Sequence, residues 1–257
     1  MNKKPAITII TATYHRPDLL ARCIKSVQAS TFKNYEHIVV SDHCPKARQV
    51  YELFSDDERI KFFENPPPHY PNHGERAHNL GIEKAESDYI CYVTDDNIIL
   101  PNHLEKIYHH LTSGNGDVVF LRTHMVRIGR GDGMVEKIVA RSLHKDLEPE
   151  RHVPGDLTGI YSKDMSQMGH TKEIITRCGA WKPTHECPGG IEDNEFMKRL
   201  EAAASNVINE EVYSNIYYIR DSCFVRDELY HKAVLNLSST EVFVFPQLLK
   251  NTGVIEV

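Results

Sequence analysis

Residues 6–27 read AITIITATYHRPDLLARCIKSV, and the spacing of their apolar side chains changes once along the stretch. The first part, Ala6–Thr11, is a short run of apolar and β-branched residues, which is typical of a buried strand. Pro17 and Asp18 then occupy positions that favour the first turn of a helix. Over residues 19–27 the apolar side chains recur on one helical face. A buried strand that leads into an amphipathic helix indicates an α/β protein.

The alternation of strands and helices continues as far as residue 121. We expect the following strands and helices: strands at His37–Val40, Ile60–Phe63, Tyr89–Val93 and Val118–Leu121, and helices at Lys46–Phe54, Glu75–Ala85 and Pro101–Leu111. Such βαβ units predict a Rossmann-like, mostly parallel central sheet flanked by helices. Because ligands bind beyond the carboxyl ends of parallel strands, we expect residues 11–16, 41–44 and 94–97 on one rim.

The second half of the chain is less regular. A glycine-rich turn at Gly129–Gly133 separates two short strand patterns, Met125–Ile128 and Met134–Val139, which predicts a hairpin. Glycine and proline interrupt residues 141–190, and helical spacing returns at Glu192–Ala204. The tail from residue 212 onward is expected to contain short strands and helix.

Composition limits the class of protein. The 257 residues include 30 Lys+Arg and 36 Asp+Glu, a formal charge of −6, which gives no basic footprint for nucleic acid. No apolar run approaches the ~20 residues that span a bilayer. The start, MNKKPAITII, has no small-residue cleavage site, so we expect no signal peptide. The six cysteines form no C-x-x-C pair, and we expect reduced thiols in the cytoplasm.

Two acidic clusters stand out. Asp95-Asp96-Asn97 follows the strand expected at Tyr89–Val93, and Glu192-Asp193-Asn194-Glu195 opens the late helix behind Gly189-Gly190. The adjacent carboxylates of Asp95 and Asp96 repel each other, and a divalent cation such as Mg²⁺ or Mn²⁺ would remove that cost. The second cluster could supply a general base. Carboxylates also stabilise the N-terminus of a helix, so a structural role stays open for both clusters.

These clusters, in this order and behind this α/β start, resemble the family 2 glycosyltransferases of the GT-A fold. The resemblance is carried by four stretches: ITIITATYHRPDLLARCIKSVQAS, HIVVSDH, GERAHNLGIEKAESDYICYVTDDNIILPNHLE and GGIEDNEFMKRL. It covers roughly residues 5–112 well and residues 155–205 loosely. It implies one GT-A domain, with a nucleotide-sugar-binding half over residues 1–112 and an acceptor-binding half with the C-terminal tail over residues 113–257.

The resemblance also implies which residues bind the nucleotide. Three side chains at the end of the first strand would line the nucleotide pocket: Thr11, Thr13 and Arg16. Asp42 would accept a hydrogen bond from the base, and Asp95 would lie near the ribose. Uracil is the commonest base in the family, which favours a UDP-sugar.

The same resemblance implies the residues of the reaction itself. Asp96, with Asn97 beside it, would ligate Mn²⁺ or Mg²⁺ at the diphosphate. Asp193, next to Glu192, would be the catalytic base. Trp181, the only tryptophan, lies where such enzymes meet the acceptor and would bind it as a stacking platform; a buried core tryptophan is the alternative.

The chain departs from the family at two places. Thr94 stands where the first aspartate of the D-x-D motif is often found, and Asn97 stands where a third acid is frequent. His78-Asn79 takes the place of a frequent Arg-Asn pair, for which Arg76 is the nearest substitute.

The implied reaction is transfer of a sugar, with inversion, from a nucleoside diphosphate sugar to a hydroxyl of a glycan or lipid-linked acceptor. A sugar nucleotidyltransferase is one alternative, but the loop TATYHRPD lacks the glycines such enzymes carry after the first strand. A degenerate, non-catalytic module that binds nucleotide sugars or glycans is the other alternative, and the departures at Thr94, Asn97 and His78 keep it open.

The remaining expectations concern partners and location. We expect a cytoplasmic protein, with peripheral association at the inner membrane face as a further possibility raised by the apolar tail at Val242–Phe245. A packed terminal element is the favoured interpretation of that tail. His69 and His73 are expected to be solvated loop residues, and His231 is the one late histidine that could complete a metal shell.

Overall fold

The structure is a computed structural model that describes residues 4–67, 74–114, 116–128, 135–141, 164–187 and 192–219. The strands are β1 (Ile7–Thr13), β2 (Tyr35–Ser41), β3 (Ile60–Glu64), β4 (Tyr89–Tyr92), β5 (Ile98–Ile99), β6 (Val118–Ile128), β7 (Val135–Arg141), β8 (Met168–Thr171) and β9 (Val207–Ile219). The helices are α1 (Pro17–Gln28), α2 (Pro45–Glu52), α3 (Glu75–Lys84), α4 (His103–Thr112), α5 (Ile175–Cys178) and α6 (Glu192–Ala203).

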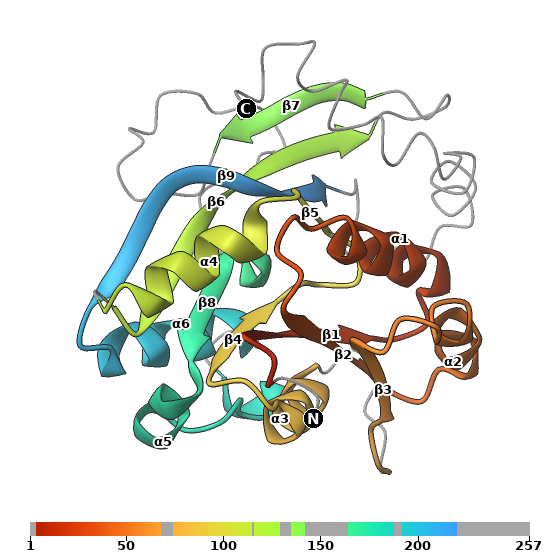
Figure 1. The fold of residues 1–257 in the computed structure, drawn as a ribbon, viewed down its shortest axis with the longest axis horizontal. Helices are drawn as coiled ribbons and strands as arrows, with labels where there is room; N and C mark the ends of the chain where they lie inside the picture. The colour runs from red at the N-terminus through yellow and green to blue at the C-terminus, as the bar shows by residue number, and fades with distance from the viewer. Residues whose placement is uncertain are drawn as a thin grey trace.

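The described strands form one sheet in the order β3-β2-β1-β4-β8-β6-β9-β5, and β7 pairs with β6. Strands β1 to β4 are mutually parallel. Strand β8 runs antiparallel to both β4 and β6, so it joins the first half of the chain to the second (Figure 1). The prediction of an α/β fold with a mostly parallel central sheet is therefore confirmed.

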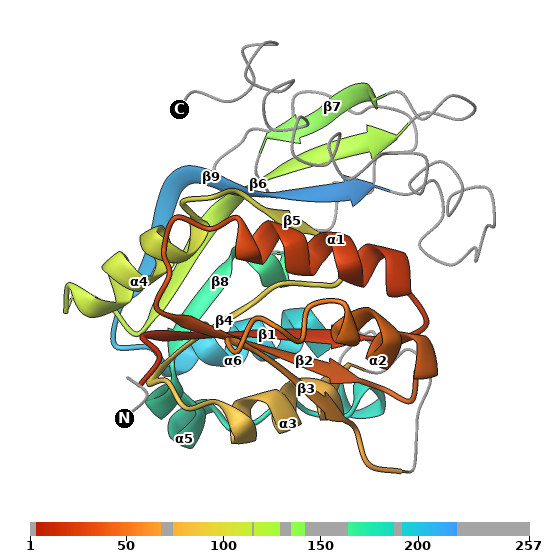
Figure 2. The same ribbon diagram turned by 45° about the vertical axis from the view of Figure 1, so that its right-hand side comes forward.

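Each face of the sheet carries its own helices, as Figures 1 and 2 show. Helices α1 and α4 cover the face to which Ile9 and Cys91 point. Helices α3 and α6 cover the opposite face, where Ile10 and Tyr92 lie. Consecutive residues of β1 and β4 thus point to opposite faces, as the period of a strand requires. Because both faces are covered, these strands contain continuous apolar runs.

Local signals place the first two helices. Pro17 and Pro45 each occupy the first helical turn, where a missing N–H costs nothing. Helix α3 lies close against β1 because position 81 is glycine: a Cβ there would lie 2.5 Å from Ile10 Cγ2. The helix start expected at Pro17 is confirmed, and the helix expected from Lys46 begins one residue earlier, at Pro45.

The second half differs most from the sequence-based expectation. Strand β6 continues to Ile128, and the strand expected at Met125–Ile128 is its outer end, paired with β7. The structure adds β8 and the short helix α5 inside the irregular region 141–190, and it begins β9 at Val207, none of which was predicted. The short β8 is only four residues long, which is too short for a periodic signal.

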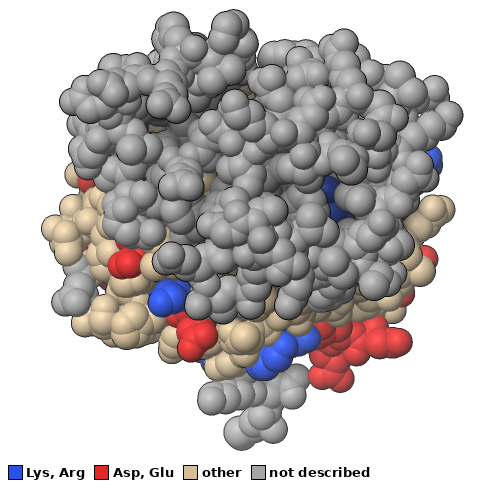
Figure 3. Space-filling view, turned by 90° about the horizontal axis from the view of Figure 1, so that it is seen from above, with Lys and Arg blue, Asp and Glu red and all other residues tan. Residues whose placement is uncertain are grey.

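Three further properties concern the described residues as a set. None of their helices is both long and apolar enough to cross a bilayer. Their cysteines, Cys23, Cys44, Cys91, Cys178 and Cys187, are all free thiols, and Cys223 lies outside the described residues. On the face drawn in Figure 3, basic and acidic side chains alternate along the described margin, without a wholly basic patch among the coloured residues.

Candidate active site

The end of β1 meets the acidic loop that follows β4. The Thr13 hydroxyl donates a hydrogen bond of 2.8 Å to Asp95 Oδ2. Arg16, the residue before α1, donates from Nε to the same oxygen at 3.1 Å, and its Nη2 lies 2.7 Å from Asp95 Oδ1. Asp95 is completely buried. Its charge is therefore balanced by a bidentate guanidinium contact, the strongest geometry for such a pair.

Asp96 lies beside this pair and is more open to solvent. Arg16 Nη1 donates to Asp96 Oδ2 at 2.9 Å, so one guanidinium contacts both aspartates. Arg22 Nη2 donates to the backbone oxygen of Asp96 at 2.7 Å. The Asp96 side chain keeps 18% of its surface exposed, against none for Asp95. Asp96 is thus the carboxylate of this pair that a ligand can reach.

Thr11 lies inside β1, below the rim, whereas Asp42 lies at the rim itself, directly after β2. Thr11 is fully buried; its hydroxyl donates to the Val93 backbone oxygen at 2.8 Å and joins β1 to β4. It therefore supports the rim from below and has no surface with which to line a nucleotide pocket. Asp42 follows β2; its amide N–H donates to the Thr13 backbone oxygen at 3.0 Å, and its Oδ1 accepts from Asn65 Nδ2 at 3.1 Å.

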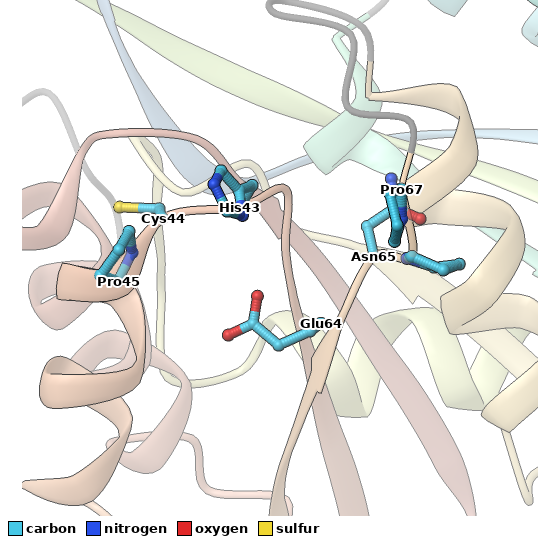
Figure 4. A pocket seen from close by; sticks show the side chains of 7 residues that line it. His43, Cys44, Pro45, Glu64, Asn65 and Pro67 are labelled. Atoms are coloured by element: carbon cyan, nitrogen blue, oxygen red, sulfur yellow. The ribbon is translucent and has the colours of Figure 1, made fainter.

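A pocket of about 330 Å³ opens next to Asp42, between the ends of β2 and β3. Figure 4 shows the Glu64 carboxylate between two walls, with His43 and Pro45 on one side and Asn65 and Pro67 on the other. His43 has a φ of 55°, which is uncommon outside glycine, and His15 at the end of β1 has a φ of 51°. Both adjacent strands thus end in a sharp left-handed turn at this rim.

The structure adds Asp164, a residue that sequence reasoning missed. It precedes β8, and its Oδ1 accepts hydrogen bonds from Asn97 Nδ2 at 3.1 Å and from the Ser166 amide at 2.7 Å. Ser166 Oγ in turn accepts a hydrogen bond from Asn97 Nδ2 at 2.8 Å. Burial, with the nearby charge of Asp96, raises the pKa of Asp164 to about 6. Asn97 therefore links the acidic loop to the start of β8.

Asp193 converges on the same group from the first turn of α6. Burial raises its pKa from 3.8 to about 7, and the charges of Glu192, Asp164 and Asp96 add to that rise. A pKa raised by all three neighbours means that these carboxylates lie within electrostatic reach of one another. The two acidic clusters, about a hundred residues apart in sequence, are thus brought to one site, together with Asp164.

Trp181 is a core residue in this structure. It is 3% exposed, and its indole stacks on the Phe196 ring with the centroids 4.1 Å apart. The His78 ring lies 4.5 Å from the indole, and Trp181 Nε1 donates to the Tyr92 hydroxyl at 3.4 Å. The indole has no free face for a sugar, which contradicts the stacking platform and agrees with the alternative of a buried tryptophan.

His78 belongs to the same aromatic cluster and not to the rim. It is buried, which lowers its pKa to about 3, so the ring is neutral at physiological pH. It cannot supply the positive charge of the arginine that is frequent at this place. Arg76, two residues earlier in the first turn of α3, is half-buried and donates from Nη2 to the Pro66 backbone oxygen at 3.0 Å, beside the pocket at Asp42.

The donor set can be compared with what a divalent cation requires. Among the described residues, no three His, Cys, Asp or Glu side chains are arranged to hold a metal ion by themselves. Mg²⁺ and Mn²⁺ sites in phosphate-binding enzymes, however, use one or two carboxylates and leave the remaining positions to phosphate and water. The open Asp96 carboxylate meets that requirement, and the buried Asn97 Oδ1 has no hydrogen-bond partner. The residues fit a cation that phosphate oxygens complete.

Several expected residues lie outside the described part of the chain. These are His69, His73, His231, the Gly129–Gly133 turn and the tail at Val242–Phe245. One signal in the sequence could have identified Asp164: an aspartate with Ser166 two residues later is typical of a capped turn, and the Asp164 side chain accepts from the Ser166 amide in this way.

Comparison with known proteins gives the family. A profile described as "Glycosyl transferase family 2" matches residues 8–167. GalNAc(5)-diNAcBac-PP-undecaprenol beta-1,3-glucosyltransferase of Campylobacter jejuni is 30% identical over 116 residues, which are 44% of this chain and 37% of that protein. Glycosyltransferase GlyG of Streptococcus pneumoniae is 27% identical over 117 residues, again 44% and 37%. The chain thus matches little more than a third of the length of these relatives.

Solved structures share the fold. S. aureus TarS 1-349, in complex with UDP-GlcNAc, superposes with a TM-score of 0.63 at 17% identity and covers 92% of this chain and 66% of that one. The mannosyltransferase PcManGT from Pyrobaculum calidifontis, in complex with GDP-Man and Mn²⁺, superposes with a TM-score of 0.58 at 10% identity, covering 99% and 77%. The predicted GT-A fold is confirmed. With its family profile matched over residues 8–167, the chain belongs to glycosyl transferase family 2.

Proposed function

We propose that this protein transfers a sugar, with inversion, from a nucleoside diphosphate sugar to a hydroxyl of a glycan or lipid-linked acceptor. Membership of glycosyl transferase family 2 supports the class of reaction. The observation that carries the proposal is the convergence of Asp96 and Asp193, whose charges act on each other across one site. A donor diphosphate and an acceptor hydroxyl must meet in such a place.

The donor would bind along the ends of β1, β2 and β4. Asp42, held by Asn65, would accept a hydrogen bond from the base at the edge of the pocket in Figure 4. Asp95, held by Thr13 and Arg16, would lie near the ribose. UDP is the favoured nucleotide; the UDP-GlcNAc complex of a protein with the same fold supports this choice.

Asp96 and Asn97 would hold Mn²⁺ or Mg²⁺ at the diphosphate. When bound, a divalent cation neutralises the charge that develops on the departing diphosphate. The Mn²⁺ in the PcManGT complex supports a role for such a cation in this fold. The residues of the chain itself supply the rest of the stabilisation, since the Arg16 guanidinium lies against both aspartates.

Asp193 would act as the general base. Its carboxylate would take the proton of the acceptor hydroxyl as the acceptor oxygen forms its bond to the anomeric carbon. The bond from that carbon to the diphosphate oxygen breaks on the opposite face, which inverts the configuration. A pKa of about 7 suits this task, because a base is most effective when its pKa lies near the working pH.

The acceptor would reach the site from the second half of the chain, residues 113–257. A lipid-linked acceptor is supported by the undecaprenol-linked substrate in the name of the Campylobacter jejuni relative. Such a substrate would bring the protein to the inner membrane face.

The test is incubation of the purified protein with a panel of UDP- and GDP-sugars, with and without Mn²⁺, while release of nucleoside diphosphate is measured. We expect slow hydrolysis of one donor that depends on Mn²⁺ and speeds up when a hydroxyl acceptor is added. Exchange of pyrophosphate into the sugar nucleotide would instead indicate a nucleotidyltransferase. Tight binding of a nucleotide sugar without turnover would indicate a non-catalytic module.

A further inference from the structure

The Arg16 guanidinium contacts Asp96, the carboxylate that would hold the proposed cation. Its Nη1 lies 2.9 Å from Asp96 Oδ2, while Nε and Nη2 contact both oxygens of Asp95. One planar group with a single positive charge therefore contacts both carboxylates. A second positive charge on Asp96 Oδ2 would meet Arg16 Nη1 at contact distance and be repelled by it.

We propose that Arg16 is a resident counter-ion of the ligand-free site, which releases Asp96 when the cation arrives with the diphosphate and then donates to the diphosphate itself. This inference rests on the proposed function and adds a positioning role to it. It predicts that the cation alone binds weakly and that cation and nucleotide strengthen each other's binding.

The contacts of the two aspartates differ in the way this exchange requires. Asp95 is fully buried and has the Thr13 hydroxyl as a further donor, so its contacts with Arg16 can persist. Asp96 is partly exposed, and Arg16 contacts it through Nη1, whereas Nε and Nη2 contact Asp95. If the guanidinium tilts while Nε and Nη2 keep their hydrogen bonds to Asp95, Nη1 moves away from Asp96. The buried charge of Asp95 then stays paired.

The position of Arg16 in the chain supports the second half of the exchange. Arg16 directly precedes α1 and its backbone oxygen accepts the Leu20 amide at 3.0 Å, so the N-terminus of that helix faces the same rim. Its side chain keeps 35% of its surface exposed. The planar arginine fork matches the oxygens of a diphosphate in two-pronged contact, which a lysine cannot do.

The experiment measures Mn²⁺ binding by electron paramagnetic resonance and UDP binding by calorimetry, each alone and together. Two variants are compared with the wild-type protein. Arg16→Gln removes the charge, and Arg16→Lys keeps a charge for the buried Asp95 but loses the fork, so at least one variant retains a partner for that carboxylate. Thermal unfolding of both variants is recorded to verify that they fold. Arg177→Gln is the matched control, because Arg177 pairs with Asp117 at the start of β6, at the end of the strands opposite to the Asp95-Asp96 loop.

We expect loss of the Arg16 charge to change the two affinities in opposite directions. Mn²⁺ alone should bind Arg16→Gln at least ~5-fold more tightly than the wild type, while UDP in the presence of Mn²⁺ should bind at least ~5-fold more weakly, in the range of ordinary coupling between sites. Arg16→Lys should change in the same directions by less. Arg177→Gln should change neither affinity. A purely structural role of Arg16 would weaken both.

Two outcomes contradict the inference, and they differ. If the wild type binds Mn²⁺ with UDP but the folded Arg16 variants bind Mn²⁺ alone no more tightly, the counter-ion exchange is wrong and the proposed function stands. If the wild type binds UDP equally well with and without Mn²⁺, the cation in the proposed function is wrong, and the exchange is wrong with it.

Discussion

Thr13 donates a hydrogen bond of 2.8 Å to Asp95 across 82 residues of sequence and so connects the end of β1 to the acidic loop after β4. The acceptor is a completely buried carboxylate. Hydrogen bonds to buried charged groups are among the stronger ones in proteins, and leaving such a group without a donor costs more than the bond itself contributes. This contact holds the end of β1 against the acidic loop.

Replacement of Thr13 by valine should therefore be costly despite the similar shape. We expect the free energy of unfolding, measured in urea, to fall by about 1–3 kcal/mol, because a buried carboxylate loses a donor. Nucleotide affinity should fall as well. Thr176→Val is the matched control, since the exposed Thr176 hydroxyl donates only to the Glu173 backbone oxygen. Equal losses in the two variants would show that the Thr13 contact is unimportant.

The buried position of Trp181 can be tested with two substitutions. Trp181→Ala should lower the free energy of unfolding by roughly 3–5 kcal/mol, because it leaves a cavity between Phe196 and His78. Trp181→Phe should be milder and should leave the KM for the acceptor unchanged. A folded Trp181→Phe protein with unchanged stability and a tenfold higher acceptor KM would restore the stacking platform.

Much of the first half of the fold follows from the sequence. Strand β1 was expected at Ala6–Thr11 and extends over Ile7–Thr13, and α3 was expected at Glu75–Ala85 and ends at Lys84. These elements show clear periods because each is buried on a defined face. Their order also predicts that Thr13, Arg16 and Asp95 meet at one rim, which the structure confirms.

Other parts of the fold and of the site depend on contacts between residues far apart in sequence, so the local sequence pattern could not predict them. Strand β8 has four residues, one of which is a glycine. It forms because β4 and β6 pair with it on both sides. Asp164 enters the site only because β8 lies there, so the Asp164–Ser166 pattern could identify its capped turn but not its place in the site. The burial of Trp181 likewise depends on α6, which brings Phe196 over the indole.

Asn97 explains one departure from the family pattern. Its amide Nδ2 donates to both Asp164 Oδ1 and Ser166 Oγ, which a carboxylate could not do. Asn97→Asp should therefore lower the free energy of unfolding by about 1–3 kcal/mol at pH 8, where Asp164 is ionised. The loss should shrink at pH 5, because Asp164 has a pKa of about 6 and then carries a proton. A pH-independent loss would contradict the contact between the two side chains.

The raised pKa of Asp193 predicts the pH dependence of transfer. The base must be ionised to accept a proton, and its pKa is raised from 3.8 to about 7. We therefore expect kcat/KM, which reports on the free enzyme, to rise about tenfold per pH unit below pH 7 and to level off above it. A profile that stays flat between about pH 5.5 and 8 would remove Asp193 as the group that titrates.

The most direct test of the account is the transfer rate of Asp193→Asn, measured beside its nucleotide affinity. The amide keeps the size of the side chain but cannot accept the proton, so we expect the rate to fall by ~10²–10⁴-fold while UDP binds as in the wild type. Asp88→Asn, at an exposed aspartate that pairs with Lys4, is the control and should retain full activity. Full transfer activity in a folded Asp193→Asn protein would contradict the central claim that this carboxylate activates the acceptor.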